Sequence, residues 1–253
     1  MTDSSLKKKH SGLGRDRLIF ALDYPSPQKA LEAVSLVRAH VGLFKIGLEL
    51  FSRSGPELVR SIQDEHQSGV FLDLKYYDIP ATVYSSVRAA SDLGVRFVTV
   101  HASGGSRMLE TAVKAAGEDT QILAVTVLTS FSRRDLEEEG FDASVKLSDL
   151  VLRRANSAKK AGCAGVICSG AEIRAIKEKF GEDFLAVVPG IRPDWGEVPG
   201  DDQQRVVTPE KAIRDGADYL VIGRPIRVAP DPAEAARRIS GEMSAAFSRS
   251  GTF

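Results

Sequence analysis

Cysteine is scarce in this chain of 253 residues, which holds only Cys163 and Cys168. The two lie in one apolar neighbourhood without histidine or cysteine partners at metal-binding spacing, which argues against a zinc site. Small secreted proteins that depend on disulfides carry many more cysteines for their length. The pair is typical of reduced thiols in a cytoplasmic protein, and we expect that location.

An excess of charge is also missing, because 34 Lys and Arg balance 34 Asp and Glu. A chain without net charge has no general attraction to nucleic acid or to an anionic membrane, so we expect neither as a partner. No apolar run approaches the roughly 18 residues of a membrane span. The basic stretch 7–10 precedes Ser-Gly-Leu-Gly, not an apolar core, so it does not indicate a signal peptide. We expect a flexible tail at 1–14 and a single domain at 15–253.

Several catalytic motifs are absent as well. The sequence has no P-loop and no serine nucleophile elbow. Its first expected strand ends in Asp23-Tyr24-Pro25, which has none of the glycines of a dinucleotide-binding turn. These absences argue against the commonest nucleotide hydrolases, serine hydrolases and dinucleotide-dependent dehydrogenases.

What is present is a regular alternation of short apolar runs and helical patterns. The runs predict strands at 18–23, 43–47, 70–75, 96–100, 121–128, 165–168, 184–188 and 219–222. The helical patterns fall at 26–40, 55–66, 80–93, 105–116, 147–161, 171–180, 209–215 and 231–247. Eight strand–helix units predict a closed (β/α)8 barrel of the TIM type. A doubly wound open sheet is the alternative, and it normally carries the glycine-rich turn that is missing here.

Two loops are longer than the usual connection, at 129–146 and 190–207. Both follow the C-terminal ends of expected strands, which is the face where barrel enzymes place their active sites. We therefore expect the active site on that face, with the second loop as a flap over it.

The third expected strand carries opposite charges. Its period-two pattern places Asp73 and Lys75 on the inward face, and Asp78 follows just past the strand end. Charges on an otherwise apolar strand are costly unless they are paired or used. One interpretation is a catalytic group; the other is a surface ion pair with Asp78 as N-cap of a helix that starts near Pro80.

Other polar residues stand at the ends of the expected strands: Asp23, Lys45, Thr126, Thr129, Arg192, Gly223 and Arg224. Lysines and aspartates around one rim would alternate in charge, and a lysine kept as ammonium by its neighbours can act as a general acid. Gly223-Arg224 is suited to clamp a phosphate, although a structural turn with a solvated arginine fits the same residues. His101 lies on the same rim, and a lone histidine is more often structural.

These residues resemble the orotidine 5′-monophosphate decarboxylase family along nearly the whole chain. The matching segments are Ala21-Leu-Asp-Tyr24, Phe44-Lys-Ile-Gly47, Phe71-Leu-Asp-Leu-Lys75, Asp78-Ile-Pro80, Thr82, Pro189-Gly-Ile-Arg192, Gln203, Arg205-Val206, Thr208-Pro209 and Ile222-Gly-Arg-Pro-Ile226. The resemblance implies conversion of orotidine 5′-monophosphate to UMP and CO2 in pyrimidine synthesis, without metal or cofactor. Tyr76-Tyr77 and Ala81 depart from the commoner Phe-His and Asn of that family, and these changes bear on packing around the base.

The resemblance also implies roles for individual residues and a homodimer with shared active sites. Lys45, Asp73, Lys75 and the partner subunit's Asp78 would form the charged network, with Lys75 as proton donor. The remaining implied contacts are Asp23 to the ribose, Ile79 and Thr82 to the neighbouring site, Thr129 and Gln203 to the base and the closing loop, and Arg192, Gly223 and Arg224 to the phosphate side.

Two other functions stay open at this point. A Mg²⁺-dependent sugar-phosphate lyase, such as a 3-keto-gulonate-phosphate decarboxylase, also carries Asp-x-Lys-x-x-Asp on its third strand. Such an enzyme needs a carboxylate at the end of the second strand, where this sequence has Lys45, whose charge would repel the ion. A non-catalytic phosphate-binding barrel would keep Arg224 but has no use for buried charges.

Overall fold

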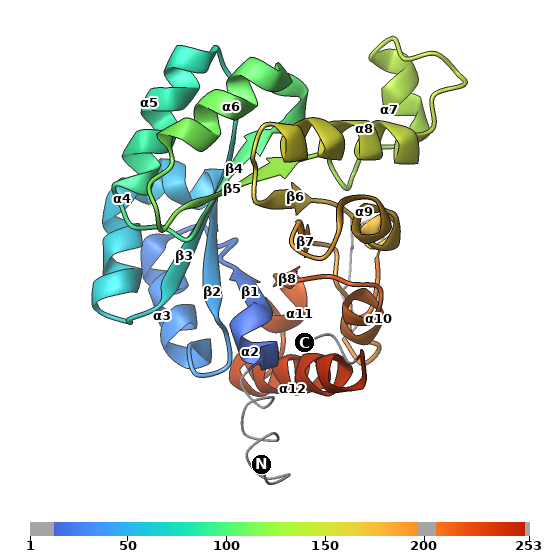
Figure 1. The fold of residues 1–253 in the computed structure, drawn as a ribbon. Helices are drawn as coiled ribbons and strands as arrows, with labels where there is room; N and C mark the ends of the chain where they lie inside the picture. The colour runs from blue at the N-terminus through green and yellow to red at the C-terminus, as the bar shows by residue number, and fades with distance from the viewer. Residues whose placement is uncertain (1–12, 197–205, 251–253) are drawn as a thin grey trace, which may run out of the picture.

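The computed structural model describes residues 13–196 and 206–250, whose strands form a closed parallel barrel (Figure 1). Its strands are β1 (Leu18–Ala21), β2 (Leu43–Gly47), β3 (Gly69–Tyr76), β4 (Phe97–His101), β5 (Gln121–Val125), β6 (Gly165–Ile167), β7 (Leu185–Val188) and β8 (Tyr219–Ile222). Each strand pairs with its neighbours in sequence order, and β8 pairs with β1 to close the ring. The predicted (β/α)8 architecture is therefore confirmed.

Helices lie outside this ring of strands (Figure 1). They are α2 (Leu13–Arg17), α3 (Pro27–Val37), α4 (Leu48–Asp64), α5 (Pro80–Ser91), α6 (Gly105–Ala115), α7 (Arg133–Glu138), α8 (Leu147–Lys160), α9 (Ile173–Phe180), α10 (Pro209–Arg214), α11 (Arg224–Arg227) and α12 (Pro232–Ser250), with a 3-10 turn at Ala102–Gly104. Among the described residues, no helix combines the length and apolarity needed to cross a membrane.

Local sequence signals explain several helix ends. Ser26 caps α3 by accepting the N–H of Lys29, and Pro27 occupies the first turn, where its missing N–H costs nothing. The stop predicted at Gly162 is present, with φ of +87° just past α8. The second helix differs from the prediction, because α4 begins at Leu48 and breaks at Gly55, whose φ of +60° precedes Pro56. The sequence pattern captured only the part after the break.

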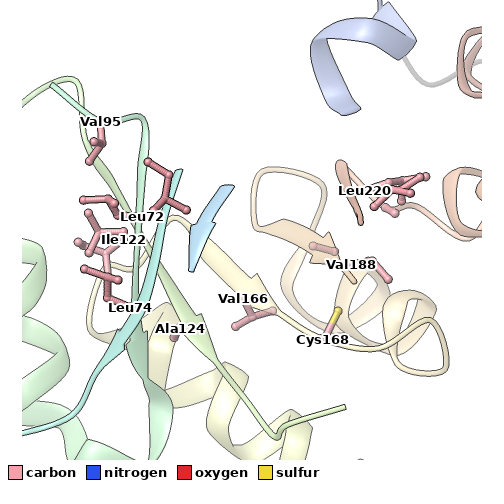
Figure 2. Packing of buried hydrophobic residues seen from close by; sticks show 14 of the residues in the cluster. Leu72, Leu74, Val95, Ile122, Ala124, Val166, Cys168, Val188 and Leu220 are labelled. Atoms are coloured by element: carbon pink, nitrogen blue, oxygen red, sulfur yellow. The ribbon is translucent and has the colours of Figure 1, made fainter. Parts of the chain in front are cut away.

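The apolar residues form two separate layers. Inside the barrel, a small cluster consists of Ile19, Ala21, Leu43, Phe71, Phe97, Leu123, Val187 and Val221. Outside it, the alternate residues of the strands belong to a larger apolar cluster that also includes residues of the helices; Leu72 of β3 and Ile122 of β5 are labelled in Figure 2. Because every strand is covered on both faces, the strands are nearly continuous apolar runs, and an inward polar residue stands out.

Helix α2, which precedes β1, packs against α12. A Cβ atom on Gly14 would lie 2.1 Å from the carbonyl oxygen of Ser240, so only glycine allows this approach. The Gly14 N–H also donates to the Ser244 hydroxyl at 3.1 Å. The expected tail boundary after residue 14 falls inside α2, and residues 1–12 lie outside the described residues.

The two long loops leave the C-terminal strand ends, as expected. The first contains the short helix α7, which Ser132 and Asp135 begin with a reciprocal capping box. The second is closed at its base, where the Arg192 N–H donates to Val207 O and the Val207 N–H donates to Gly190 O. The two ends of the second loop are therefore held together beside β7.

Candidate active site

Three strands place a polar side chain in the same layer of the barrel interior. Lys45, Asp73 and Thr99 each come two residues after an inward apolar residue, namely Leu43, Phe71 and Phe97. Period-two alternation keeps both members of each pair on the inward face. The apolar residues fill the barrel, and the polar residues lie above them at the C-terminal end.

The charged side chains form a chain of alternating sign. Lys45 Nζ lies 3.4 Å from Asp23 Oδ1 and 3.7 Å from Asp73 Oδ2, and Lys75 Nζ lies 2.8 Å from Asp73 Oδ1. The Asp73 and Lys75 side chains are 14% and 29% exposed, so the interpretation of this pair as a surface ion pair is wrong. The Lys45 side chain is only 11% exposed. Asp23, whose side chain is 57% exposed, forms the solvent-facing end of this row of charges. Three predicted members of the network, Lys45, Asp73 and Lys75, therefore lie together within one subunit, and Asp23, predicted as a ribose contact, extends the row of charges.

The positive charges of this network shift the pKa of Asp73. Burial by itself would raise the pKa of Asp73, but Lys45 and Lys75, together with hydrogen bonds from Lys75 and Thr99, hold it below its ordinary value. The carboxylate is thus ionised at neutral pH and binds two ammonium groups from opposite sides.

Lys75 departs from regular strand geometry. Pairing of β3 with β4 shifts register between Leu72 and Tyr76, and Lys75 has a φ of +48°. A non-glycine residue in this region is uncommon, carries a cost in free energy, and is found most often at functional sites. The bulge changes the direction of the Lys75 side chain, so that its ammonium group contacts the Asp73 carboxylate.

A cavity of about 150 Å³ opens beside these groups. Lys45, Asp73 and Lys75 line one part of it, and the rest is mostly apolar: Phe71, Val125, Val127, Leu128, Thr129, Ile167, Pro189 and Val221. Such a space suits a flat ring whose apolar faces are covered while one edge meets the charged residues. Thr129, predicted as a base contact, lines this cavity.

Asp78, Ile79 and Thr82 are exposed and lie beyond β3. Helix α5 begins at Pro80 with Ile79 as N-cap and without a side-chain cap, so the alternative of an Asp78 N-cap is wrong. Asp78 Oδ1 instead accepts the N–H of Ile79 at 2.6 Å. These residues do not line the cavity of their own subunit.

The residues expected on the phosphate side come from two elements. Arg224 opens α11, and Gly223 precedes it with φ of −114° and ψ of −92°. A Cβ atom on Gly223 would lie 3.4 Å from Asp23 Oδ2, so glycine keeps space beside the open end of the network. Arg192 stands at the base of the second long loop and donates to Ile191 O at 2.8 Å. Gln203 lies outside the described residues.

Comparison with known proteins assigns this arrangement to a family. The sequence model described as "Orotidine 5'-phosphate decarboxylase / HUMPS family" matches residues 16–239. The chain belongs to this family. A relative named orotidine 5′-phosphate decarboxylase, from Desulfosudis oleivorans, is 48% identical over 247 residues, covering 96% of this chain and 99% of the relative.

Further comparisons agree in fold and in name. A second relative of that name, from Syntrophotalea carbinolica, is 48% identical over 241 residues, covering 92% of this chain and 97% of the relative. The crystal structure of orotidine 5′-phosphate decarboxylase from Lactobacillus acidophilus superposes with a TM-score of 0.78 at 36% identity, covering 89% of this chain and 98% of that one. The relatives carry the name of a carboxy-lyase, and this chain is an enzyme of that class.

Thr99 also belongs to this site, although it was not predicted from the sequence. The signal was available: Thr99 is a polar residue on the inward face of its strand, at the position that Lys45 and Asp73 occupy on theirs. It is fully buried and hydrogen-bonded to both Asp73 and Lys75.

Arg227 was also missed. Its guanidinium donates to the backbone carbonyl of Asp23 at 2.9 Å and lies 5.9 Å from the centre of the Tyr24 ring. It therefore supports the segment that carries Asp23. No sequence signal pointed to it, because the two residues are 204 positions apart.

His101 remains a residue of the rim rather than of the network. Its ring lies 5.6 Å from the ring of Tyr77, and burial together with the positive charges of Arg154 and Lys75 lowers the pKa of His101 below 6.5. The imidazole is therefore neutral at pH 7. In the described ranges, no group of three or more His, Cys, Asp or Glu could hold a metal ion.

Proposed function

We propose that this chain converts orotidine 5′-monophosphate to UMP and CO2, as a step of pyrimidine nucleotide synthesis, without a metal or cofactor. The observation that carries the proposal is the alternating chain Asp23–Lys45–Asp73–Lys75 beside a largely apolar cavity. The names of the relatives supply the substrate.

The reaction breaks the bond between C6 of the pyrimidine and its carboxylate carbon. CO2 departs, and C6 keeps the electron pair in the plane of the ring, where no adjacent carbonyl can delocalise it. Lys75 as ammonium stabilises this charge as it develops and then donates a proton to C6. One C–C bond is replaced by one C–H bond, and Lys75 regains its proton from water.

The other residues of the network fix the position of the Lys75 ammonium group. Asp73 holds Nζ of Lys75 at 2.8 Å and faces the leaving carboxylate. Lys45 bridges Asp73 and Asp23, so a shift of one charge would disturb all of them. Asp23 has an exposed carboxylate that can accept the ribose hydroxyls. This pre-arranged charge is the main source of transition-state stabilisation in the proposal.

Phosphate binding is remote from the reacting carbon in this scheme. Gly223 and Arg224 bind the phosphate, Arg192 approaches it from the loop base, and Thr129 contacts the base. The binding energy of the phosphate closes the 190–207 loop, with Gln203, over the cavity and excludes water. It therefore contributes to kcat as well as to affinity.

Metal independence is proposed from Lys45. A Mg²⁺-dependent lyase of the same barrel type requires a carboxylate at the end of the second strand. Here that position carries a buried ammonium group, 3.7 Å from the Asp73 carboxylate that would hold the ion. The ammonium group occupies the space of that carboxylate ligand and carries the same sign of charge as Mg²⁺, so it would repel the ion.

A homodimer with shared sites is also part of the proposal. Large apolar side chains are exposed close to Asp78 in the segment that follows β3: Tyr77, Ile79 and Tyr84. Ile79 and Tyr77 are 66% and 63% exposed, which is costly on an isolated subunit and typical of an interface. A second copy that covers this surface by two-fold symmetry would bring Asp78, Ile79 and Thr82 to its neighbour's cavity. Cys163 and Cys168 are buried and are not joined in a disulfide, in accord with the cytoplasmic location that we propose.

A decarboxylation assay tests the proposal. Purified enzyme is incubated with orotidine 5′-monophosphate with and without excess EDTA, and loss of orotidylate absorbance is followed. We expect turnover at equal rates in both. Turnover that EDTA abolishes and Mg²⁺ restores would support the lyase instead. Binding of the nucleotide without turnover would support the non-catalytic barrel.

A further inference from the structure

Thr99 is a fully buried polar residue on β4 whose hydroxyl connects two residues of the site. Thr99 Oγ1 accepts the backbone N–H of Lys75 at 2.9 Å and lies 3.0 Å from Asp73 Oδ1. An amide N–H can only donate and an ionised carboxylate can only accept. The single proton of the hydroxyl is therefore committed to Asp73, and the orientation of Thr99 has no alternative.

The bulge in β3 explains why this hydroxyl is needed. Leu72 pairs with Val98 and Tyr76 pairs with Val100, so Asp73, Leu74 and Lys75 together face Thr99 alone. A bulge leaves backbone groups without partners in the strand ladder. The Thr99 side chain supplies the acceptor that the β4 backbone does not offer to Lys75. It does so at the residue whose φ is +48°.

We propose that Thr99 is a positioning residue, whose hydroxyl holds the Lys75 backbone in its left-handed conformation and the Asp73 carboxylate in its orientation at the same time. The lysine backbone and the aspartate carboxylate are thereby tied to one atom. This tie sets the 2.8 Å separation of Lys75 Nζ and Asp73 Oδ1. The catalytic consequence rests on the proposed function, but the geometric inference does not.

The physical reason is pre-organisation. Lys75 has a long side chain with several rotatable bonds, and a strained backbone returns to an ordinary conformation unless its surroundings hold it. A misplacement of about 1 Å at a reacting centre can lower a rate about a hundredfold. A single hydroxyl that restrains the Lys75 backbone and the Asp73 carboxylate would prevent such a misplacement.

Kinetics of three variants test the proposal. Thr99→Val keeps the shape and removes the hydroxyl, and Thr99→Ser keeps the hydroxyl. Thr120→Val is the matched control, because Thr120 is also buried and also both accepts and donates, from Ser91 and to Val95 O, but at the opposite end of the barrel.

We expect Thr99→Val to lower kcat for orotidylate about a hundredfold, with KM changed by less than about threefold, because the phosphate contacts are untouched. Thr99→Ser should restore most of the activity, and Thr120→Val should lose stability without loss of kcat. Equal losses in Thr99→Val and Thr120→Val, or no rescue by serine, would make Thr99 merely structural. If Thr99→Val does not fold, Thr99→Ala removes the same hydroxyl and is judged by the same outcomes.

A second measurement is independent of the reaction. Carbon-13 NMR titration of Asp73 in the free enzyme should show a higher pKa in Thr99→Val, since a hydrogen bond to the charged form is lost. A crystal structure of that variant should show Lys75 outside the left-handed region. An unchanged Asp73 titration with an unchanged Lys75 backbone would overturn the inference. If wild-type enzyme does not decarboxylate orotidylate, the proposed function fails, but these two measurements still decide the role of Thr99.

Discussion

Lys75 Nζ lies 2.8 Å from Asp73 Oδ1, although the two residues belong to one strand and the strand bulges between them. In a regular strand, residues two apart are roughly 6.6 Å apart along the chain, and their side chains run parallel. The bulge and the positive φ of Lys75 turn the ammonium back toward the carboxylate. Asp73 therefore receives Lys75 on one oxygen and Lys45 on the other, and both cations are held at the cavity wall.

Removal of Arg224 should separate phosphate binding from the rest of the site. We expect Arg224→Ala to lower kcat/KM for orotidine 5′-monophosphate by roughly ten- to a hundredfold, since a charge-assisted clamp contributes about 1.5–3 kcal/mol. The phosphate-free nucleoside orotidine should be affected little. Steady-state kinetics with both substrates measure this. Arg214→Ala, an exposed arginine on α10, is the control. Equal losses for the two substrates would mean that Arg224 is structural.

Complementation should reveal whether Asp78 acts across a subunit interface. Lys75→Ala and Asp78→Ala are each expected to be nearly inactive. When the two variants are unfolded and refolded together, about half of the dimers should be mixed, and one of the two sites in each mixed dimer is whole. Activity should return to roughly a quarter of the wild-type value, because intact Lys75 then meets intact Asp78 of the other subunit.

The control for this experiment is each variant refolded alone, with mixed dimers verified by native mass spectrometry. If Asp78 acts within its own subunit, every site in the mixture lacks one residue. No activity would then return, and the shared-site proposal would be refuted.

Lys177 should matter for stability rather than for catalysis. It is buried on α9, with Nζ 2.7 Å from Asp218 Oδ2, 3.0 Å from Glu182 O and 3.1 Å from Phe184 O. Lys177→Met leaves Asp218 without its cation and two carbonyls without a donor. We expect the free energy of unfolding to fall by about 3 kcal/mol, with kcat of the folded enzyme unchanged. Urea denaturation measures this, and Lys179→Met on the exposed side of the same helix should change it by less than about 0.5 kcal/mol.

Asp73 should make stability depend on pH in the acid range. The folded-state pKa of Asp73 lies below 3.8 because Lys45, Lys75 and two hydrogen bonds outweigh the effect of burial. A carboxylate of this kind stabilises the fold above its unfolded-state pKa, and this contribution is lost as the pH falls through the folded-state value. The deficit of Asp73→Asn relative to wild type should therefore be full at pH 7 and shrink below about pH 4.

Urea denaturation at a series of pH values measures this deficit. Asp64→Asn, an exposed carboxylate on α4, controls for the loss of one acidic residue. A deficit of the same size at pH 7 and pH 3 would contradict the expected linkage.

Much of the fold and part of the site could be predicted because their determinants are local. Alternation of apolar residues marks each strand, and Ser26-Pro27 and Gly162 mark helix ends through their own backbone preferences. The order of eight such units leaves few architectures other than a barrel. Charged residues at strand ends, such as Lys45 and Asp73, then gather on one rim because the C-terminal ends of all strands in a parallel barrel share one face.

Other features followed from contacts that no local pattern encodes. Period-two alternation placed Asp73 and Lys75 on one inward face, but it could not predict the bulge or the backbone conformation of Lys75. The N-cap interpretation of Asp78 was wrong because Pro80 already begins α5 and Ile79 occupies the cap position. The break at Gly55-Pro56 divided a helix of which only the second half was predicted.

The amino-acid sequence by itself determined the eight-unit barrel, the rim on which the chemistry lies and the identities of the charged residues, since each depends on neighbours within a few positions. Only the tertiary structure decided how those charges are held. Thr99 reaches Lys75 across 24 positions, and Arg227 reaches Asp23 across 204, so these partners meet only when the barrel closes. A side-chain hydroxyl or guanidinium makes such a contact within about 3 Å, and that precision comes from packing, which no sequence period contains.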